Sequence, residues 1–152
     1  MKVINPKSIE GWDSLIVELN KVFDELPEVP EIEFNREVND ILYLESLQML
    51  FESVDRQYTE CAIFAESMRS TMSLWKDNEE IRLRDDIVTN HIHEYPNEKD
   101  RESKVKQGLQ EHTKRLRAAR MFGKIIESNK RLLARSEKRL DQIIMIEKKV
   151  RY

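Results

Sequence analysis

The sequence has little of the chemistry on which secreted, membrane-spanning and turn-rich proteins depend. It contains one cysteine, three glycines and four prolines among 152 residues. A single cysteine excludes an intrachain disulfide and a cysteine-based zinc site, and it fits a reducing compartment. So little glycine and proline argues against a disordered chain or an all-β fold. No run of about 18 apolar residues is present, and the N-terminus lacks a signal-peptide core, so we expect no membrane span and a cytoplasmic protein.

Motifs for catalysis, cofactor binding or metal binding are also missing. There is no glycine-rich phosphate loop, no HExxH pair and no meaningful order of Ser, His and Asp. His91-x-His93-Glu94 is interpreted as a solvated loop, with a metal site as the alternative. Cys61 falls on an apolar helical stripe, so we interpret it as a small buried hydrophobe and not a nucleophile. The sequence therefore predicts a protein that is not an enzyme and needs no cofactor or metal.

The chain is instead rich in charge and in helix-forming residues. Charged residues make up 36% of it, and the mean hydropathy is −0.66. Apolar residues are therefore sparse, and any core should be a narrow seam between long helices. The clearest pattern is a strict alternation of three- and four-residue steps, which is typical of a left-handed coiled-coil seam. We predict that these residues form the core or contact another subunit: Leu44, Leu47, Phe51, Val54, Tyr58, Cys61, Ala65, Met68, Met72 and Trp75.

A second apolar stripe follows a polar stretch around Pro96. From about residue 99 to residue 148 the chain has no proline, and we expect one helix there. Polar residues at seam positions in this helix (His112, Asn129 and Ser136) should fix register. Its apolar stripe comprises Val105, Leu109, Leu116, Ala119, Phe122, Ile126, Leu133, Leu140, Ile143 and Ile144. The fold predicted for residues 35–152 is an all-α antiparallel helical hairpin about 70 Å long.

Residues 1–34 should form a short N-terminal helix and a linker that contains proline. Ser8 is the expected N-cap of this helix, Pro27 and Pro30 end it, and Asn35 caps the next helix. Its apolar face is predicted to comprise Ile9, Trp12, Leu15, Ile16, Leu19 and Phe23. Several apolar residues lie off the main seam and need cover from this helix or from another subunit, so we expect a homo-oligomer. They are Leu42, Met49, Leu50, Ile63, Phe64 and Leu74.

Charge is distributed very unevenly along the chain. Residues 1–100 carry 10 Lys or Arg and 23 Asp or Glu, whereas residues 101–152 carry 16 and 6. One interpretation is that the basic C-terminal helix balances the acidic helix across the hairpin, and we expect Arg115 and Arg139 to do so. The other is that part of the basic helix faces outward and contacts phosphate, as nucleic-acid-binding proteins do.

The outward-facing interpretation selects six residues at helical steps of three, four or seven. These candidate nucleic-acid-binding residues are Lys114, Arg117, Lys124, Arg131, Arg135 and Lys138. Aromatic residues for base stacking are scarce in this half: Phe122 is expected to face the seam, and Tyr152 is the other. Binding of single-stranded or duplex nucleic acid should therefore depend on the phosphate backbone and show little sequence preference.

Two short segments carry a resemblance to a known family. Asp100-Arg101-Glu102-Ser103-Lys104-Val105 starts the last helix, and LLARSEKRLDQIIMIEKK lies near its end. With the helical layout of residues 40–150, they resemble the UvsY-type recombination mediators of tailed phages. The resemblance implies an oligomeric all-helical protein that binds single-stranded DNA. It also implies a recombinase or a single-strand-binding protein as partner and, for a phage protein, the host cytoplasm as location. The alternative is a structural or adaptor coiled-coil protein, for example a virion or assembly component, that binds other proteins only.

Overall fold

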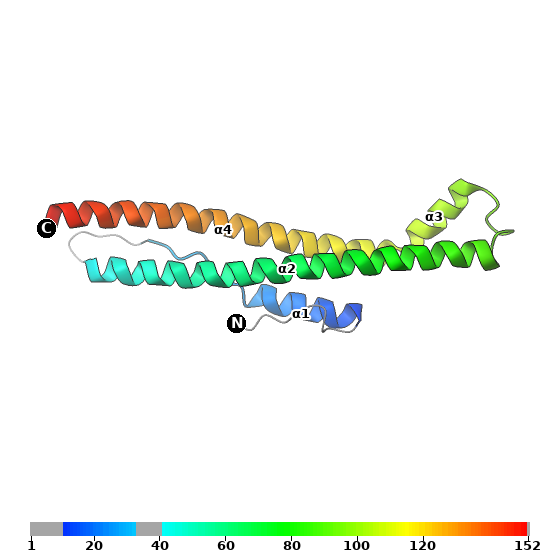
Figure 1. Cartoon of the computed structure of the whole chain (residues 1–152), viewed down its shortest axis with the longest axis horizontal. Helices are drawn as coiled ribbons and strands as arrows, with labels where there is room; N and C mark the ends of the chain where they lie inside the picture. Colours follow the sequence, from blue (N-terminus) through cyan, green and yellow to red (C-terminus); the bar gives the residue numbers. More distant parts are fainter. Residues whose placement is uncertain (1–10, 33–40, 152) are drawn as a thin grey trace.

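The protein is an all-α helical hairpin in which two long helices, α2 (Ile41–Asn90) and α4 (Gln110–Arg151), pack side by side. The short helix α1 (Trp12–Asp24) lies beside α2, and the short helix α3 (Glu98–Gly108) precedes α4 (Figure 1). The computed structural model describes residues 11–32 and 41–151. Within them, no helix combines the length and the apolar character needed to cross a membrane.

The predicted seam is the core of the hairpin. Nine of its ten residues are buried, and Trp75 is half-buried against the same core. They pack against the stripe of α4, where Leu116, Leu133 and Leu140 are buried and Ile143 is half-buried. The seam residues therefore meet their partners within one chain. His112, Asn129 and Ser136 are half-buried at the positions expected for them.

The last helix is not continuous, contrary to the sequence prediction. Asn97 caps α3, its side chain accepting a hydrogen bond from the Lys99 backbone N–H, and α3 ends at Gly108. Figure 1 shows α3 leaving the axis of α4 at this point. A Cβ atom on Gly108 would lie 2.8 Å from Leu83 Cδ1, so the missing side chain lets the two helices approach closely at the bend. Val105, Leu109 and Ile87 form a small separate core there.

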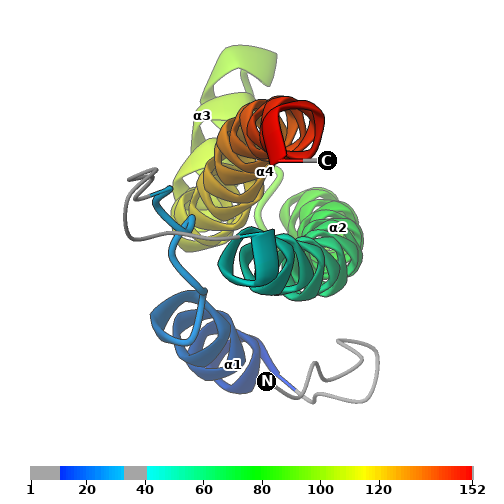
Figure 2. The ribbon, with the colours of Figure 1, turned by 90° about the vertical axis from the view of Figure 1, so that its left-hand side faces the viewer.

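The N-terminal helix packs against both helices of the hairpin, as Figure 2 shows. Gly11 is the N-cap of α1, whereas the expected caps Ser8 and Asn35 lie outside the described residues, as does Ile9. Leu15, Leu19 and Val22 are buried, and Phe23 is partly exposed beside Phe122, with ring centroids 5.8 Å apart. Val22 therefore belongs to the buried apolar face of α1, and Phe23 lies at the edge of that face.

The chain after α1 continues along the hairpin instead of forming a detached linker. Leu26, Val29 and Ile32 pack against the core formed by the first half of α2 and the end of α4. The Tyr58 hydroxyl donates a hydrogen bond to the Pro27 carbonyl and fixes this path. Residues 11–32 thus belong to the same packed unit as the hairpin.

Residues 11–32 cover only part of the apolar surface of α2 that lies off the main seam. Among the six residues expected to need cover, Phe64 is buried in the core that α1 shares with the hairpin. The other five, all on α2, remain exposed: Leu42, Met49, Leu50, Ile63 and Leu74.

Candidate nucleic-acid interface

The basic strip (Lys114, Arg117, Lys124, Arg131, Arg135 and Lys138) lies on the exposed side of α4. All six side chains are exposed, whereas the α4 residues that face α2, such as Phe122 and Leu133, are buried. At 3.6 residues per turn, the mean direction of the six side chains is opposite to the mean direction of the buried stripe around the helix axis. From residue 114 to residue 138 it spans about 36 Å of helix at about 1.5 Å per residue.

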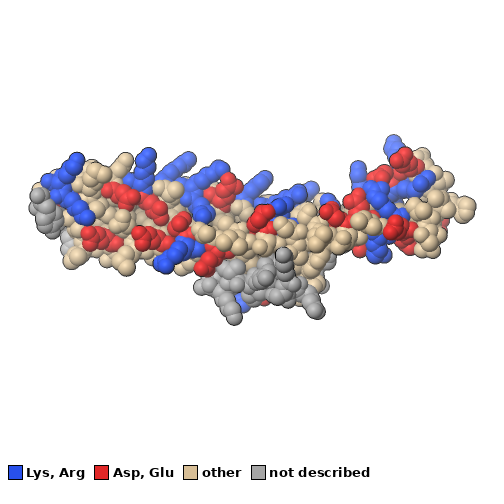
Figure 3. Space-filling view, in the orientation of Figure 1, with Lys and Arg blue, Asp and Glu red and all other residues tan. Residues whose placement is uncertain are grey.

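Figure 3 shows the Lys and Arg side chains projecting along the α4 edge, with Asp and Glu gathered along the middle of the same face. Helix α4 carries 13 Lys or Arg against 5 Asp or Glu, a net charge of +8. Helix α2 carries 5 Lys or Arg against 10 Asp or Glu, a net charge of −5. The two signs are therefore separated across the width of the hairpin.

The cations of the basic strip are not paired with acidic side chains of α2. Lys114 contacts Glu111 at 3.5 Å and Arg131 contacts Glu127 at 2.6 Å, and both carboxylates lie one turn earlier on α4. These pairs are exposed, so each contributes little to stability. The other four cations of the strip form no ion pair with any residue in the described ranges.

Cross-helix polar contacts involve other residues. Lys148 Nζ lies 3.7 Å from Glu45 Oε1, and Lys130 Nζ donates to Thr59 Oγ1 at 2.9 Å. Glu137, on α4, faces carboxylates: burial raises its pKa, and Asp55, Asp141 and Glu52 raise it further. Carboxylates of both helices therefore meet at this point of the seam, where simple charge balancing would have placed cations.

The two arginines expected to balance α2 differ in their environments. Arg115 is half-buried, as a residue next to the seam should be. Arg139 is exposed and forms no ion pair within the part of the chain that the structure describes, so its predicted role was wrong. Position 139 is adjacent to Leu140 in sequence, but consecutive helical residues point about 100° apart.

The first residues of the basic strip border a groove of about 750 Å³ between α2, α3 and the start of α4. Lys76 and Lys106 also line this groove, with Lys114 and Arg117. Sequence reasoning missed Lys76 because it belongs to the acidic helix, and it missed Lys106 because the bend between α3 and α4 was not predicted. The antiparallel register could have indicated Lys76, because it brings this residue of α2 opposite the beginning of α4.

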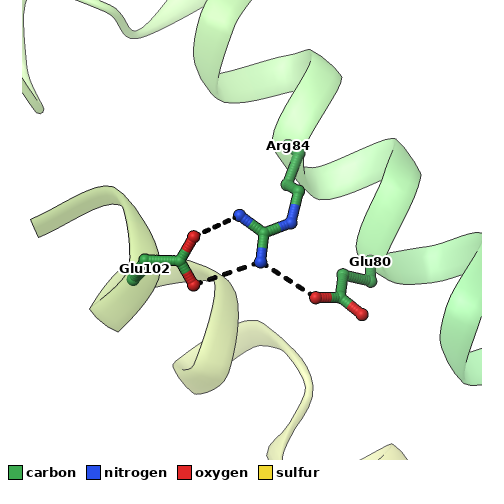
Figure 4. A network of polar contacts seen from close by, with 3 residues as sticks. All are labelled: Glu80, Arg84 and Glu102. Atoms are coloured by element: carbon green, nitrogen blue, oxygen red, sulfur yellow. Dashed lines mark hydrogen bonds and ion pairs between the residues drawn. The ribbon is translucent and has the colours of Figure 1, made fainter. Parts of the chain in front are cut away.

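An ion-pair network holds α3 against α2 beside this groove (Figure 4). Arg84 Nη1 donates to Glu102 Oε1 at 2.5 Å, and Arg84 Nη2 donates to Glu102 Oε2 at 3.1 Å and to Glu80 Oε1 at 2.9 Å. The hydrogen bonds from Arg84 lower the pKa of Glu102. Arg84 thus pairs with both carboxylates of the groove, whose lining also includes the four cations Lys76, Lys106, Lys114 and Arg117.

The residues considered for other chemistry lie in different environments. Cys61 is fully buried, and burial raises the pKa of its thiol to about 11, so at neutral pH it is protonated. His91 lies 3.5 Å from Asp86 and 3.2 Å from Glu94, whereas His93 is exposed in the loop. Within the described ranges, no group of three or more His, Cys, Asp or Glu side chains is arranged to hold a metal ion.

Comparison of the chain with known proteins adds no relative. No protein-family model, curated protein or solved structure matches it.

Proposed function

We propose that this chain is a non-enzymatic protein that binds the phosphate backbone of nucleic acid through the basic strip of α4. The observation that carries the proposal is the exposure of all six cations on the side of α4 away from the core, without ion pairs to α2. A row of Lys and Arg along one helix neutralises phosphates and releases their counterions on binding. The groove cations Lys76 and Lys106 extend this surface at one end.

Single-stranded DNA is the ligand we predict first. The resemblance to UvsY-type mediators favours it, and that resemblance alone suggests a recombinase or single-strand-binding protein as a further partner. Phe122 is buried, so it is not free to stack on a base, and Tyr152 lies outside the described residues. Contacts should therefore be made to phosphates and depend little on sequence.

The adaptor function is the second candidate, and exposed apolar side chains favour it. Met121, Ile125 and Leu132 follow α4 beside the basic strip and are at least one-third exposed. Apolar side chains flanked by cations can bind an acidic amphipathic helix of another protein. The two functions differ in ligand, so a direct titration with DNA separates them.

A charge-reversal experiment with a matched control tests the proposal. The test variant carries Arg131→Glu, Arg135→Glu and Lys138→Glu. The control variant carries Lys21→Glu, Lys99→Glu and Lys104→Glu, which are exposed residues of α1 and α3. Both variants change the net charge from −3 to −9, so only the location of the change differs. Circular dichroism and light scattering check that helicity and particle size are retained.

Removing three of six phosphate contacts should lower affinity for a labelled oligonucleotide by at least about 100-fold at about 0.1 M salt. The control variant should lose less than about tenfold, because its changes act only through the screened field. Equal losses in the two variants would show that net charge and not the basic strip determines binding. If reversal of the strip destroys helicity, these cations balance α2 and the proposal is wrong.

A further inference from the structure

One face of α2 carries a row of large apolar side chains that nothing in residues 11–32 or 41–151 covers. Each of them is 57 to 72% exposed: Leu42, Met49, Ile63, Leu74, Ile81 and Val88. At 3.6 residues per turn they fall within an arc of about 80°. This arc lies on the side of the helix opposite the buried residues Leu47 and Ala65. Exposed apolar surface of this extent, several hundred Å², usually marks an interface.

The sequence spacing of the positions on this face reads the same from the first position forward as from the last position backward. Positions 42, 49, 56 and 63 are seven residues apart, as are positions 67, 74, 81 and 88, and the halves are four residues apart. Two of these eight positions are not apolar, because position 56 is Arg and position 67 is Ser. The eight positions are symmetric about position 65. In an antiparallel pair centred there, Leu42 meets Val88 of the second copy and Met49 meets Ile81. Ile63 meets Ser67, and Leu74 meets Arg56, whose aliphatic stem can pack on an apolar side chain. A two-fold interface requires such a self-complementary patch, because both subunits present the same surface.

We propose that two copies of this chain pair through α2, antiparallel, with a two-fold axis near residue 65. The seven-residue repeat suits helices that wrap around each other. Ser70 lies within the arc of the row and Ser46 and Ser53 lie at its edge, and these small side chains leave room for those of the second copy. Helix α4 lies on the other side of α2, so the basic strip of each copy stays on the outside of the pair.

The charges beside the row determine how this association responds to salt. Acidic residues outnumber basic ones there: Glu45, Glu52, Glu60, Asp77 and Asp85 against Arg56 and Arg82. Antiparallel pairing brings Glu52 of one copy beside Asp77 of the other, and like charges repel. Salt screens this repulsion, so the pair should become tighter as ionic strength rises. DNA binding through α4 should weaken over the same range. The inference therefore does not depend on the proposed function.

Sedimentation velocity over a dilution series tests the pairing at low and moderate salt. The informative variants are Met49→Asp, Ile81→Lys and the two together, because positions 49 and 81 face each other only in the antiparallel pair. Met145→Asp is the matched control, since Met145 is 55% exposed but lies on α4, away from the row. Circular dichroism verifies that each variant keeps its helicity.

We expect a wild-type particle of twice 18.2 kDa that dissociates less readily at the higher salt. Met49→Asp should weaken the pair at least about tenfold, and adding Ile81→Lys should restore much of that loss. Met145→Asp should leave it unchanged. A wild-type chain that stays at 18.2 kDa at about 100 µM overturns the inference. So does a dimer that Met49→Asp does not weaken, or one that the double variant weakens further, as parallel pairing predicts.

Discussion

Replacing Phe51 by Ala should increase the rate at which Cys61 reacts with a thiol reagent, although the two residues lie in different parts of the core. Phe51 is fully buried among Leu44, Val54 and Leu133. Cys61 is fully buried in the neighbouring cluster that includes α1. It is the only cysteine in the sequence, so it reports opening of the hairpin without an added label.

The magnitude follows from the burial of Phe51. Removing a fully buried phenyl group costs about 3–5 kcal/mol of the free energy of unfolding. If the hairpin opens as one unit, the population of the open state rises by the corresponding factor, about 100- to 4,000-fold. A buried thiol reacts only from the open state, because the reagent needs access to the thiolate.

The assay is the reaction of the native protein with 5,5′-dithiobis(2-nitrobenzoate), followed by absorbance. The reagent is in molar excess over the protein but at a low absolute concentration. Met145→Ala is the control, because an exposed side chain on α4 should change the rate less than about threefold. A rate for Phe51→Ala within threefold of wild type would refute the reasoning. It would mean that Cys61 becomes accessible by local detachment of α1, so that the two clusters are not one cooperative unit.

Other substitutions and a change of pH should behave as follows. Leu47→Asp should unfold the hairpin, because an unpaired carboxylate would enter a buried seam, and loss of the far-ultraviolet helical signal would reveal it. His93→Ala should leave the thermal midpoint unchanged within error, since the side chain is exposed. Tyr58→Phe should lower the free energy of unfolding in urea by about 1 kcal/mol, because it removes the hydrogen bond to Pro27. Burial raises the pKa of Cys61 from 9.0 to about 11, so its contribution to stability is complete below pH 9 and is lost as pH rises through 11. Urea titrations at pH 8 and pH 11 should show a steeper decline for wild type than for Cys61→Ala.

The sequence predicted the hairpin well because its signal is periodic. An alternation of three- and four-residue steps from Leu44 to Trp75 can be satisfied only by a helix that packs along its whole length. The loop near Pro96 followed from proline and polar residues. The break at Gly108 was missed because a single glycine is tolerated in many helices. A Cβ atom at position 108 would meet Leu83 Cδ1, which comes from the other arm of the hairpin, so a larger residue there would have to displace that side chain.

The exposure of the basic strip could be predicted, but its surroundings could not. Counting helical positions from Ile126, in the middle of the buried stripe of α4, places Arg117 and Lys124 on the outside. Arg139 is adjacent to Leu140 in sequence but points away from the seam, because consecutive helical residues are about 100° apart. Lys76 and Lys106 join the groove only through the antiparallel register and the bend between α3 and α4. Such contacts depend on tertiary structure, which a helical repeat does not encode.

The most direct test of the central claim is the salt dependence of wild-type binding to single-stranded DNA. Fluorescence anisotropy of a labelled oligonucleotide at several salt concentrations between about 50 mM and 200 mM gives the slope of log affinity against log salt. Six phosphate contacts predict a slope of about −4 and an affinity loss of about 300-fold over this range. No binding at the lowest salt, or an affinity independent of salt, would contradict the claim that the exposed cations of α4 bind nucleic acid.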